Sequence, residues 1–310
     1  MSYKVFIDGA HGTTGLKIRS YLQARDDIEI IEIAEDLRKD LNERVRLAKE
    51  ADVSLLCLPD AASRELAEAA PPDVRLIDTS TAFRTDPDWV YGLPELKRGQ
   101  REKIRNSTRT ANPGCHATGF IVLAEPVVEA GVVSPDYPFD CFSVTGYSGG
   151  GKQMIEKHHA SDRPEYLISP GQYALKQAHK HLPEMVMMSG ITEAPAFSPV
   201  VGDYFSGMVV TVPLHRRLMK SPLSVEELRQ LFRDHYAGEP LIRVMDQDPE
   251  DGFIHSDIMK QRNDLEIFVT GNDDRPILIS RFDNLGKGAS GAAVQNLNIM
   301  LGIEETKGLL

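Results

Sequence analysis

The sequence is poor in cysteine and lacks any long apolar run. Its 310 residues include three cysteines, which lie far apart and form no Cys/His cluster with the spacing of a zinc site. An odd number of dispersed cysteines argues against a disulfide framework, so we expect reduced thiols and no metal site. No apolar run approaches the roughly 20 residues of a transmembrane helix, and the first residues lack the basic and apolar regions of a signal peptide. These absences predict a cytoplasmic protein without membrane contacts.

Basic residues are fewer than acidic residues. The chain carries 35 basic and 46 acidic residues, which gives a formal net charge of -11. Excess carboxylates repel the phosphates of nucleic acids and anionic membranes, so we expect neither as a partner. A small anionic substrate stays compatible with this composition, because a single pocket can be positive on an acidic protein.

The first 80 residues alternate between strand and helix patterns. Strand patterns occupy residues 3–8, 28–33, 51–59 and 74–80, and helix patterns include residues 16–22 and 60–69. Strands that alternate with helices form parallel βαβ units. This alternation predicts an α/β domain with a Rossmann-like parallel sheet.

The pattern changes after residue 119. An apolar helix is followed by longer alternating strands, which predict an α+β domain with a mostly antiparallel sheet. A glycine-rich loop at residues 286–291 then opens a final apolar helix, which we expect to return the chain to the first domain. The predicted domains are residues 1–115 with 286–310, for dinucleotide binding, and residues 116–285, for the substrate.

A glycine-rich turn joins the first strand to the first helix. It reads G-A-H-G-T-T-G, with G-x-x-G-x-x-G spacing in place of the usual G-x-G-x-x-G. In this context glycines let the backbone approach a pyrophosphate at a helix N-terminus, and a tight turn without a ligand is the alternative. The cofactor contacts predicted here are Gly9, His11, Gly12, Thr13, Thr14 and Gly15.

Local sequence does not decide between NAD and NADP. Glu35 lies where an acidic residue would hold a ribose 2′-hydroxyl. Arg38 and Lys39 would instead suit a 2′-phosphate.

A second glycine-rich loop, G-Y-S-G-G-G-K at residues 146–152, matches the first seven positions of a phosphate-binding P-loop. Gln153 then replaces the Ser or Thr that would hold Mg²⁺, so a P-loop phosphotransferase is a weaker interpretation. A loop whose amides and Lys152 contact an anionic substrate fits better, and a plain turn at a strand end is the alternative.

Cys115 follows the turn residues Asn112, Pro113 and Gly114 and precedes a helix pattern. The free amides and the dipole of a helix N-terminus favour a thiolate, which is a strong nucleophile toward acyl groups. Cys57 and Cys141 lie in apolar strand patterns and are expected to be inert. Cys115 is therefore the candidate nucleophile.

A thiol nucleophile needs a proton carrier, and H-K-H-L-P-E at residues 179–184 is the most concentrated source. His179 and His181 would project to one side of an extended chain, and Glu184 would orient one of them, although an exposed loop is the alternative. His158 and His159 lie among charged residues and are expected to be solvated. His116 neighbours the cysteine in the chain, which usually directs a side chain elsewhere.

Taken together, these motifs resemble the N-acetyl-γ-glutamyl-phosphate reductases of arginine biosynthesis, and their order and length resemble the shorter branch of that family. The motifs are G-A-H-G-T-T-G-L, D-T-S-T-A-F-R, Y-G-L-P-E-L, A-N-P-G-C-H-A-T-G, Y-S-G-G-G-K, A-H-K-H-L-P-E-M, V-P-L-H and G-K-G-A-S-G-A-A-V-Q-N. One departure is His116, where the family usually has an aromatic Tyr or Phe.

The resemblance implies NADPH as cofactor, Cys115 as the nucleophile and His179 or His181 as the acid/base, without deciding between the two histidines. It also implies that the second domain mediates assembly into a homo-oligomer, a dimer or a tetramer. Arg38 would then contact the cofactor, and Asn296 the nicotinamide amide. The substrate, a small acyl phosphate, would be contacted by Arg84, Asn112, Ser148, Gly149, Lys152 and Glu184.

In the implied reaction, Cys115 displaces phosphate from N-acetyl-L-glutamyl 5-phosphate, and hydride transfer to the thioester releases the 5-semialdehyde. Related reductases acting on aspartyl or aminoadipyl phosphates remain open, because one methylene changes binding by only about 1–3 kcal/mol. A non-catalytic NADP-binding sensor also remains open, in which Cys115 would be dispensable.

Overall fold

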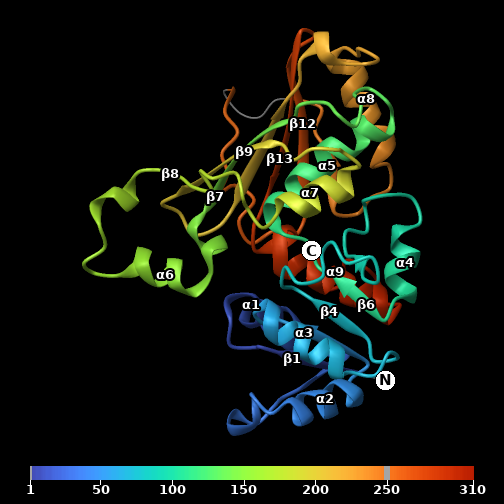
Figure 1. Cartoon of the computed structure of the whole chain (residues 1–310), viewed down its shortest axis with the longest axis vertical. Helices are drawn as coiled ribbons and strands as arrows, with labels where there is room; N and C mark the ends of the chain where they lie inside the picture. Colours follow the sequence, from blue (N-terminus) through green and yellow to red (C-terminus); the bar gives the residue numbers. More distant parts are fainter. Residues whose placement is uncertain (1, 248–251) are drawn as a thin grey trace. The chain divides into compact units, whose positions relative to one another are not determined.

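The computed structural model describes residues 2–247 and 252–310, and the chain divides into two compact units (Figure 1). Unit 1 comprises Met1–Pro113 and Ala289–Leu310, and unit 2 comprises Gly114–Gly288. Cys115 therefore belongs to unit 2, directly after the chain leaves unit 1.

Unit 1 is built on a six-stranded sheet with the order β2-β1-β3-β4-β6-β5, in which all neighbouring strands run parallel. The strands are β1 (Tyr3–Asp8), β2 (Ile28–Ile31), β3 (Val53–Leu56), β4 (Leu76–Asp78), β5 (Val90–Tyr91) and β6 (Arg109–Ala111). The predicted Rossmann-like parallel sheet is confirmed.

Helices pack in two groups in unit 1. The helices are α1 (Thr13–Gln23), α2 (Leu41–Glu50), α3 (Asp60–Ala69), α4 (Gln100–Asn106) and α9 (Gly291–Leu301). Helices α2 and α3 pack against each other, whereas α1 and α4 both pack against α9, which contacts β3 and β4. Phe6, Leu56, Leu66 and Leu76 belong to one apolar cluster that also includes residues of α2.

Helix α9 is buried along its whole length, so its polar side chains need partners inside the protein. The Gln295 amide donates to the carboxylates of Glu95 and Glu305, at 2.8 and 2.7 Å. The Asn298 amide donates to the backbone carbonyl of Glu305 at 3.0 Å. These bonds tie the helix to the residues that follow it and to the loop before α4.

A buried ion pair joins the end of β1 to α2. Nε of Arg44 lies 2.7 Å from a carboxylate oxygen of Asp8, and both side chains are almost fully buried. Burial raises the pKa of Asp8, and the hydrogen bond from Arg44 opposes that rise. Removing either partner would leave an uncompensated buried charge beside the glycine-rich turn.

Unit 2 is built on a seven-stranded sheet with the order β11-β12-β13-β10-β7-β9-β8. The strands are β7 (Asp140–Gly146), β8 (Gly171–Gln172), β9 (Ala196–Gly202), β10 (Met208–Pro213), β11 (Ile242–Val244), β12 (Leu265–Asn272) and β13 (Arg275–Phe282). The β7/β9 and β11/β12 pairs are parallel and the other four are antiparallel, which confirms the mostly antiparallel prediction.

Helix α5 is the centre of the helical layer in unit 2. The helices are α5 (Cys115–Glu129), α6 (Gly151–His159), α7 (Leu182–Ser189) and α8 (Val225–His235). Helix α5 packs on β10 and β13 and also contacts α7 and α8 (Figure 1). It is buried from His116 to Val127, so its apolar composition reflects a helix enclosed on all sides.

Two features of α5 fix how it packs. At Gly119, an added Cβ would collide with the side chains of Val210 and Phe282, so the helix approaches the sheet where it has no side chain. Pro126 lies inside the helix and has no N–H to donate to the carbonyl of Val122. The Tyr236 hydroxyl donates to that carbonyl at 2.8 Å, so a residue just after α8 satisfies the acceptor that proline leaves.

Gly119→Ala tests the close approach of α5 to its sheet. We expect the free energy of unfolding to fall by about 1–3 kcal/mol, because the new methyl group overpacks a filled space. Urea unfolding followed by circular dichroism measures this change. The matched control is Gly171→Ala, where an added Cβ has Val201 as its nearest neighbour at 4.0 Å and stability should be nearly unchanged. Equal stability of the two variants would contradict this packing.

Candidate active site

The glycine-rich turn of unit 1 has the geometry that the sequence predicted for a dinucleotide site. Gly9 has a φ of +87°, and a Cβ there would collide with the carbonyl of Cys57. Gly12 is the N-cap of α1, and Thr13 and Thr14 form the first turn of that helix. A Cβ at Gly15 would collide with the backbone of Gly9, so glycine is required at both ends of the turn.

A pocket of 560 Å³ lies against this turn in unit 1. Its lining includes Gly9, His11, Gly12, Glu35, Arg38 and Lys39. Arg38 donates to the Glu35 carboxylate at 2.9 Å, so the cation and the anion that compete for the ribose 2′ position are neighbours. The pocket offers amides, a helix N-terminus and both charges, which fits a dinucleotide.

Asn296 and Asn112 are joined inside unit 1. The Asn296 amide nitrogen donates to the Asn112 side-chain oxygen at 3.1 Å and to the carbonyl of Gly92 at 2.8 Å. Among the residues that the structure describes, the buried Oδ1 of Asn296 has no partner. A buried amide oxygen without a donor is suited to the carboxamide of a nicotinamide ring.

Arg84 is buried, and its guanidinium donates to backbone carbonyls. Nε donates to the carbonyl of Asn112 at 2.9 Å, and Nη2 donates to that of Thr79 at 3.1 Å. The sequence predicted a substrate contact for Arg84; the bonds in the structure hold the segment that leads into α5.

Cys115 is the first residue of α5, as the sequence predicted. Gly114 is the N-cap, and its amide donates to the Glu184 carboxylate at 3.1 Å. Gly288 has no side chain where a Cβ would lie 2.8 Å from the Cβ of Cys115. The helix start is therefore held by a carboxylate of α7 and closely covered by the backbone at Gly288.

Three histidines gather beside the start of α5. The ring centroid of His116 lies 5.5 Å from that of His179 and 5.6 Å from that of His181, and the last two lie 4.7 Å apart. His179 and His181 are therefore together, as predicted, although they lie in a turn that leads into α7 and not in an extended chain. The expectation that His116 points elsewhere is wrong, because its ring packs against those of His179 and His181.

His116 is held as a neutral ring. Nδ1 lies 2.8 Å from the Ser143 hydroxyl, and Nε2 lies 2.7 Å from the Tyr173 hydroxyl. Burial, assisted by the charges of His179 and Lys180, lowers the pKa of His116 to about 3. Burial also raises the pKa of Tyr173, and the charge of Cys115 adds to that rise.

The chain resembles semialdehyde dehydrogenases along nearly its whole length. Residues 4–106 match the model for "Semialdehyde dehydrogenase, NAD binding domain", and residues 115–284 match that for "Semialdehyde dehydrogenase, dimerisation domain". N-acetyl-gamma-glutamyl-phosphate reductase 2 of Nostoc sp. is 45% identical, and the match covers 99% of each chain. The N-acetyl-gamma-glutamyl-phosphate reductase of Brucella anthropi is 42% identical, covering 97% of this chain and 99% of that one.

The chain belongs to the N-acetyl-γ-glutamyl-phosphate reductase family of semialdehyde dehydrogenases.

Solved semialdehyde dehydrogenases share its fold. Aspartate semialdehyde dehydrogenase II of Vibrio cholerae has a TM-score of 0.69 at 18% identity, covering 97% of this chain and 99% of that one. The enzyme of Francisella tularensis has a TM-score of 0.72 at 15% identity, covering 96% and 100%. In the described part of this family member, no helix is both long and apolar enough to cross a membrane.

The second glycine-rich loop, in unit 2, is not built like a P-loop. The amides of Gly146, Tyr147 and Ser148 donate to carbonyls of residues 204–207, so they do not cradle a phosphate. The Ser148 hydroxyl accepts from Asn284 at 3.0 Å. Gly149 is exposed, and Lys152 is 77% exposed with Glu156 at 3.7 Å.

The expectation that His158 is solvated is wrong. Its ring is buried and stacks on Tyr147 at 4.2 Å, and Nδ1 lies 3.2 Å from the Asp203 carboxylate. Tyr147 also bonds to His159 at 2.9 Å. His158 and His159 together hold Tyr147 in the loop before α6. The charged residues next to His158 in the sequence did not indicate its burial, because Asp203 is distant in the chain.

Sequence reasoning missed Tyr173 and Ser143, which bond to His116. The Glu184 carboxylate accepts from the Gly114 amide, and its orientation of a histidine stays a prediction. Alternation along β7 is the one signal that could have directed Ser143 inward, beside Cys141.

Native thiol labelling tests the placement of the cysteines. We expect iodoacetamide at pH 7.5 to modify Cys115 first, because free amides at the start of α5 favour its thiolate. Burial raises the pKa of Cys57 to about 12 and also raises the pKa of Cys141, which keeps both thiols protonated. Peptide mass spectrometry identifies the modified residue, and earlier labelling of Cys57 or Cys141 would contradict this assignment.

His116→Phe tests the neutral ring. Because the pKa of native His116 is about 3 and the unfolded value is about 6.5, unfolded chains bind the extra proton between these pH values. The contribution of His116 to the free energy of unfolding is therefore fully present above pH 6.5 and decreases as the pH falls below that value. We expect the fall in urea midpoint between pH 8 and pH 5 to be smaller in His116→Phe than in the native protein. A control variant of the exposed His215, His215→Gln, should keep the native difference.

Proposed function

We propose that the protein reduces N-acetyl-L-glutamyl 5-phosphate to N-acetyl-L-glutamate 5-semialdehyde and phosphate, with NADPH as cofactor, as a step of arginine biosynthesis. The observation that carries this proposal is the combination of 42–45% identity to named reductases over nearly the full chain with a cysteine at the first residue of α5.

Cys115 would act as the nucleophile. Its thiolate attacks the γ-acyl carbonyl, a C–S bond forms, the C–O bond to phosphate breaks, and inorganic phosphate leaves. After reduction of the thioester, the C–S bond of the thiohemiacetal breaks, the aldehyde leaves and the thiolate is regenerated. When bound, NADPH supplies the hydride for that reduction.

His179 and His181 are the candidates for the proton carrier. They lie together beside His116, and the pKa of about 3 removes His116 itself from that role at neutral pH. One of the pair would protonate the oxygen that becomes negative as the thioester is reduced and would take that proton back when the thiohemiacetal breaks.

The cofactor would be held by the turn of unit 1. Gly9, Gly12 and Gly15 permit close approach of a pyrophosphate, and Thr13 and Thr14 begin the helix whose dipole favours it. His11 and Arg38 line the same pocket, where Arg38 would meet the 2′-phosphate. Asn296 would accept from the nicotinamide carboxamide through the buried oxygen that lacks a partner among the described residues.

The residues proposed to contact the substrate differ in their surroundings. The exposed side chain of Lys152 would meet an anion, and Ser148 and Gly149 form the turn before it. Arg84, Asn112 and Glu184 are bonded within the protein, which supports a role in holding the segment around Cys115.

We also propose a cytoplasmic homo-oligomer, a dimer or a tetramer, that assembles through unit 2. The model matched by this unit is named for dimerisation. Phe142 on β7 is 46% exposed, on the side of the strand opposite to the buried Cys141 and Ser143. An exposed aromatic residue on a sheet face is suited to a second copy of the chain.

The reverse reaction tests the proposed activity. The protein receives NADP⁺, phosphate and either N-acetylglutamate semialdehyde or aspartate semialdehyde, and NADPH absorbance is followed. We expect a phosphate-dependent signal with the acetylated substrate. A signal with aspartate semialdehyde alone would keep the chemistry and overturn the substrate, and binding of NADP⁺ without turnover of either would favour a sensor.

Cys115→Ser is the matched variant in this assay. We expect turnover to fall by at least about a thousandfold, because a serine hydroxyl is a poor nucleophile without its own base, while NADP⁺ binding is retained. Cys141→Ser is the control and should keep turnover in the folded protein. Substantial turnover by Cys115→Ser would exclude the thioester.

A further inference from the structure

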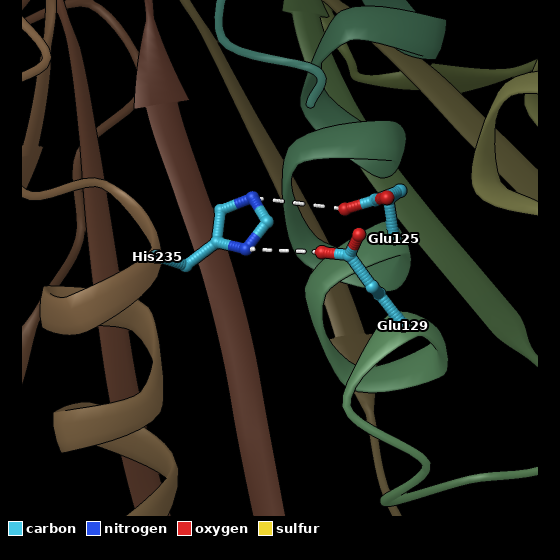
Figure 2. Close-up of side chains that lie close together, drawn as sticks. All are labelled: Glu125, Glu129 and His235. Atoms are coloured by element: carbon cyan, nitrogen blue, oxygen red, sulfur yellow. Dashed lines mark ion pairs between the residues drawn. The ribbon is translucent and has the colours of Figure 1, made fainter. Parts of the chain in front are cut away.

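The end of α8 meets the last turns of α5 in a cluster of three potential metal ligands. Glu125 and Glu129, one helical turn apart on α5, both face His235, the last residue of α8 (Figure 2). Nε2 of His235 lies 3.6 Å from a Glu125 carboxylate oxygen, and Nδ1 lies 3.7 Å from one of Glu129. One ligand atom from each residue lies within 4.8 Å of those of the other two.

Both distances are too long for hydrogen bonds. They run to different ring nitrogens of His235, so only one of them can be an edge of a site around a single ion. A hydrogen bond from an imidazole N–H requires about 2.7–3.2 Å. Ligand atoms at about 2.0–2.1 Å from a tetrahedral metal lie about 3.4 Å from one another. The distance of 3.6 Å between Nε2 of His235 and a Glu125 carboxylate oxygen is therefore close to the distance between two ligand atoms of such a site.

Burial and charge at the cluster favour a cation. The Glu125 residue is only 2% exposed, and the His235 side chain is 16% exposed. The two carboxylates concentrate negative charge beside an imidazole, and imidazole is a common metal ligand.

We propose that Glu125, Glu129 and His235 bind one divalent transition-metal ion, with Zn²⁺ the best match. One imidazole nitrogen with two carboxylates suits Zn²⁺ more than Mg²⁺ or Ca²⁺, which prefer oxygen ligands alone. His235 and Glu125 form the buried part of the site. Glu129 is 56% exposed, so it can move the short distance that closes coordination, and water would complete the tetrahedron.

The helices are held together independently of any ion. The Tyr236 hydroxyl bonds to the carbonyl of Val122, which lies one turn before Glu125. This bond sets the position of the α8 end against α5. A metal ion would therefore bind a site whose backbone is already placed and would add a second connection between the two helices.

Metal binding to the full-length protein tests this proposal. All titrations use the Cys115→Ser background, so that the active-site thiol does not bind the metal. After dialysis against EDTA, Zn²⁺ is titrated in competition with a chromophoric chelator, and Co²⁺ is titrated with its visible spectrum recorded. We expect one equivalent of each metal and a Co²⁺ spectrum of a nitrogen and oxygen site.

The variants identify the ligands. Glu125→Gln and His235→Gln should each weaken Zn²⁺ binding by at least about tenfold, since loss of outer-shell partners alone weakens metal affinity by about 10–100-fold. His215→Gln, on an exposed histidine, should bind as the parent does. Should buried Glu125→Gln fail to fold by circular dichroism, the exposed Glu129→Gln and His235→Gln carry the comparison.

Two outcomes would overturn the proposal. Zn²⁺ binding that is equal in all variants would place the metal elsewhere, for example at the other histidine cluster. The absence of binding at micromolar Zn²⁺ would leave His235 as a proton-binding bridge between two carboxylates. Neither outcome depends on the proposed activity, because binding is read without substrate or cofactor.

Discussion

The hydrogen bond between the Gly114 amide and the Glu184 carboxylate determines how α5 begins, and the proposed chemistry depends on that beginning. A carboxylate near a helix N-terminus is favoured by the helix dipole. Gly114 is the N-cap of α5, so this bond fixes the residue directly before Cys115.

Helix α5 is held by packing contacts along its length in unit 2. Its closest approach to the sheet is at Gly119, and its proline gap at Val122 is filled by Tyr236. The nucleophile is at one end of this helix, and the cluster around His235 is at the other. Because a buried helix moves as a unit, the α8 contact and the cysteine position are held by the same packing.

The features that the sequence could predict depend on interactions between residues close together in the chain. The glycine turn and the start of the helix at Cys115 depend on neighbours within a few residues, and the structure has both. The burial of His158 depends on Asp203, and the contacts of the His116 ring depend on Tyr173 and His179. Contacts of that kind leave no periodic or local signal, and they account for the wrong expectations about the histidines.

His116 combines the packing of an aromatic ring with two polar contacts. The ring is buried, neutral and in edge contact with other rings. Its two nitrogens then satisfy the hydroxyls of Ser143 and Tyr173, which a phenyl ring would leave without that partner. The ring of His116 is therefore committed to packing and to these two contacts, and the proton transfer of the proposed reaction is left to the other two histidines.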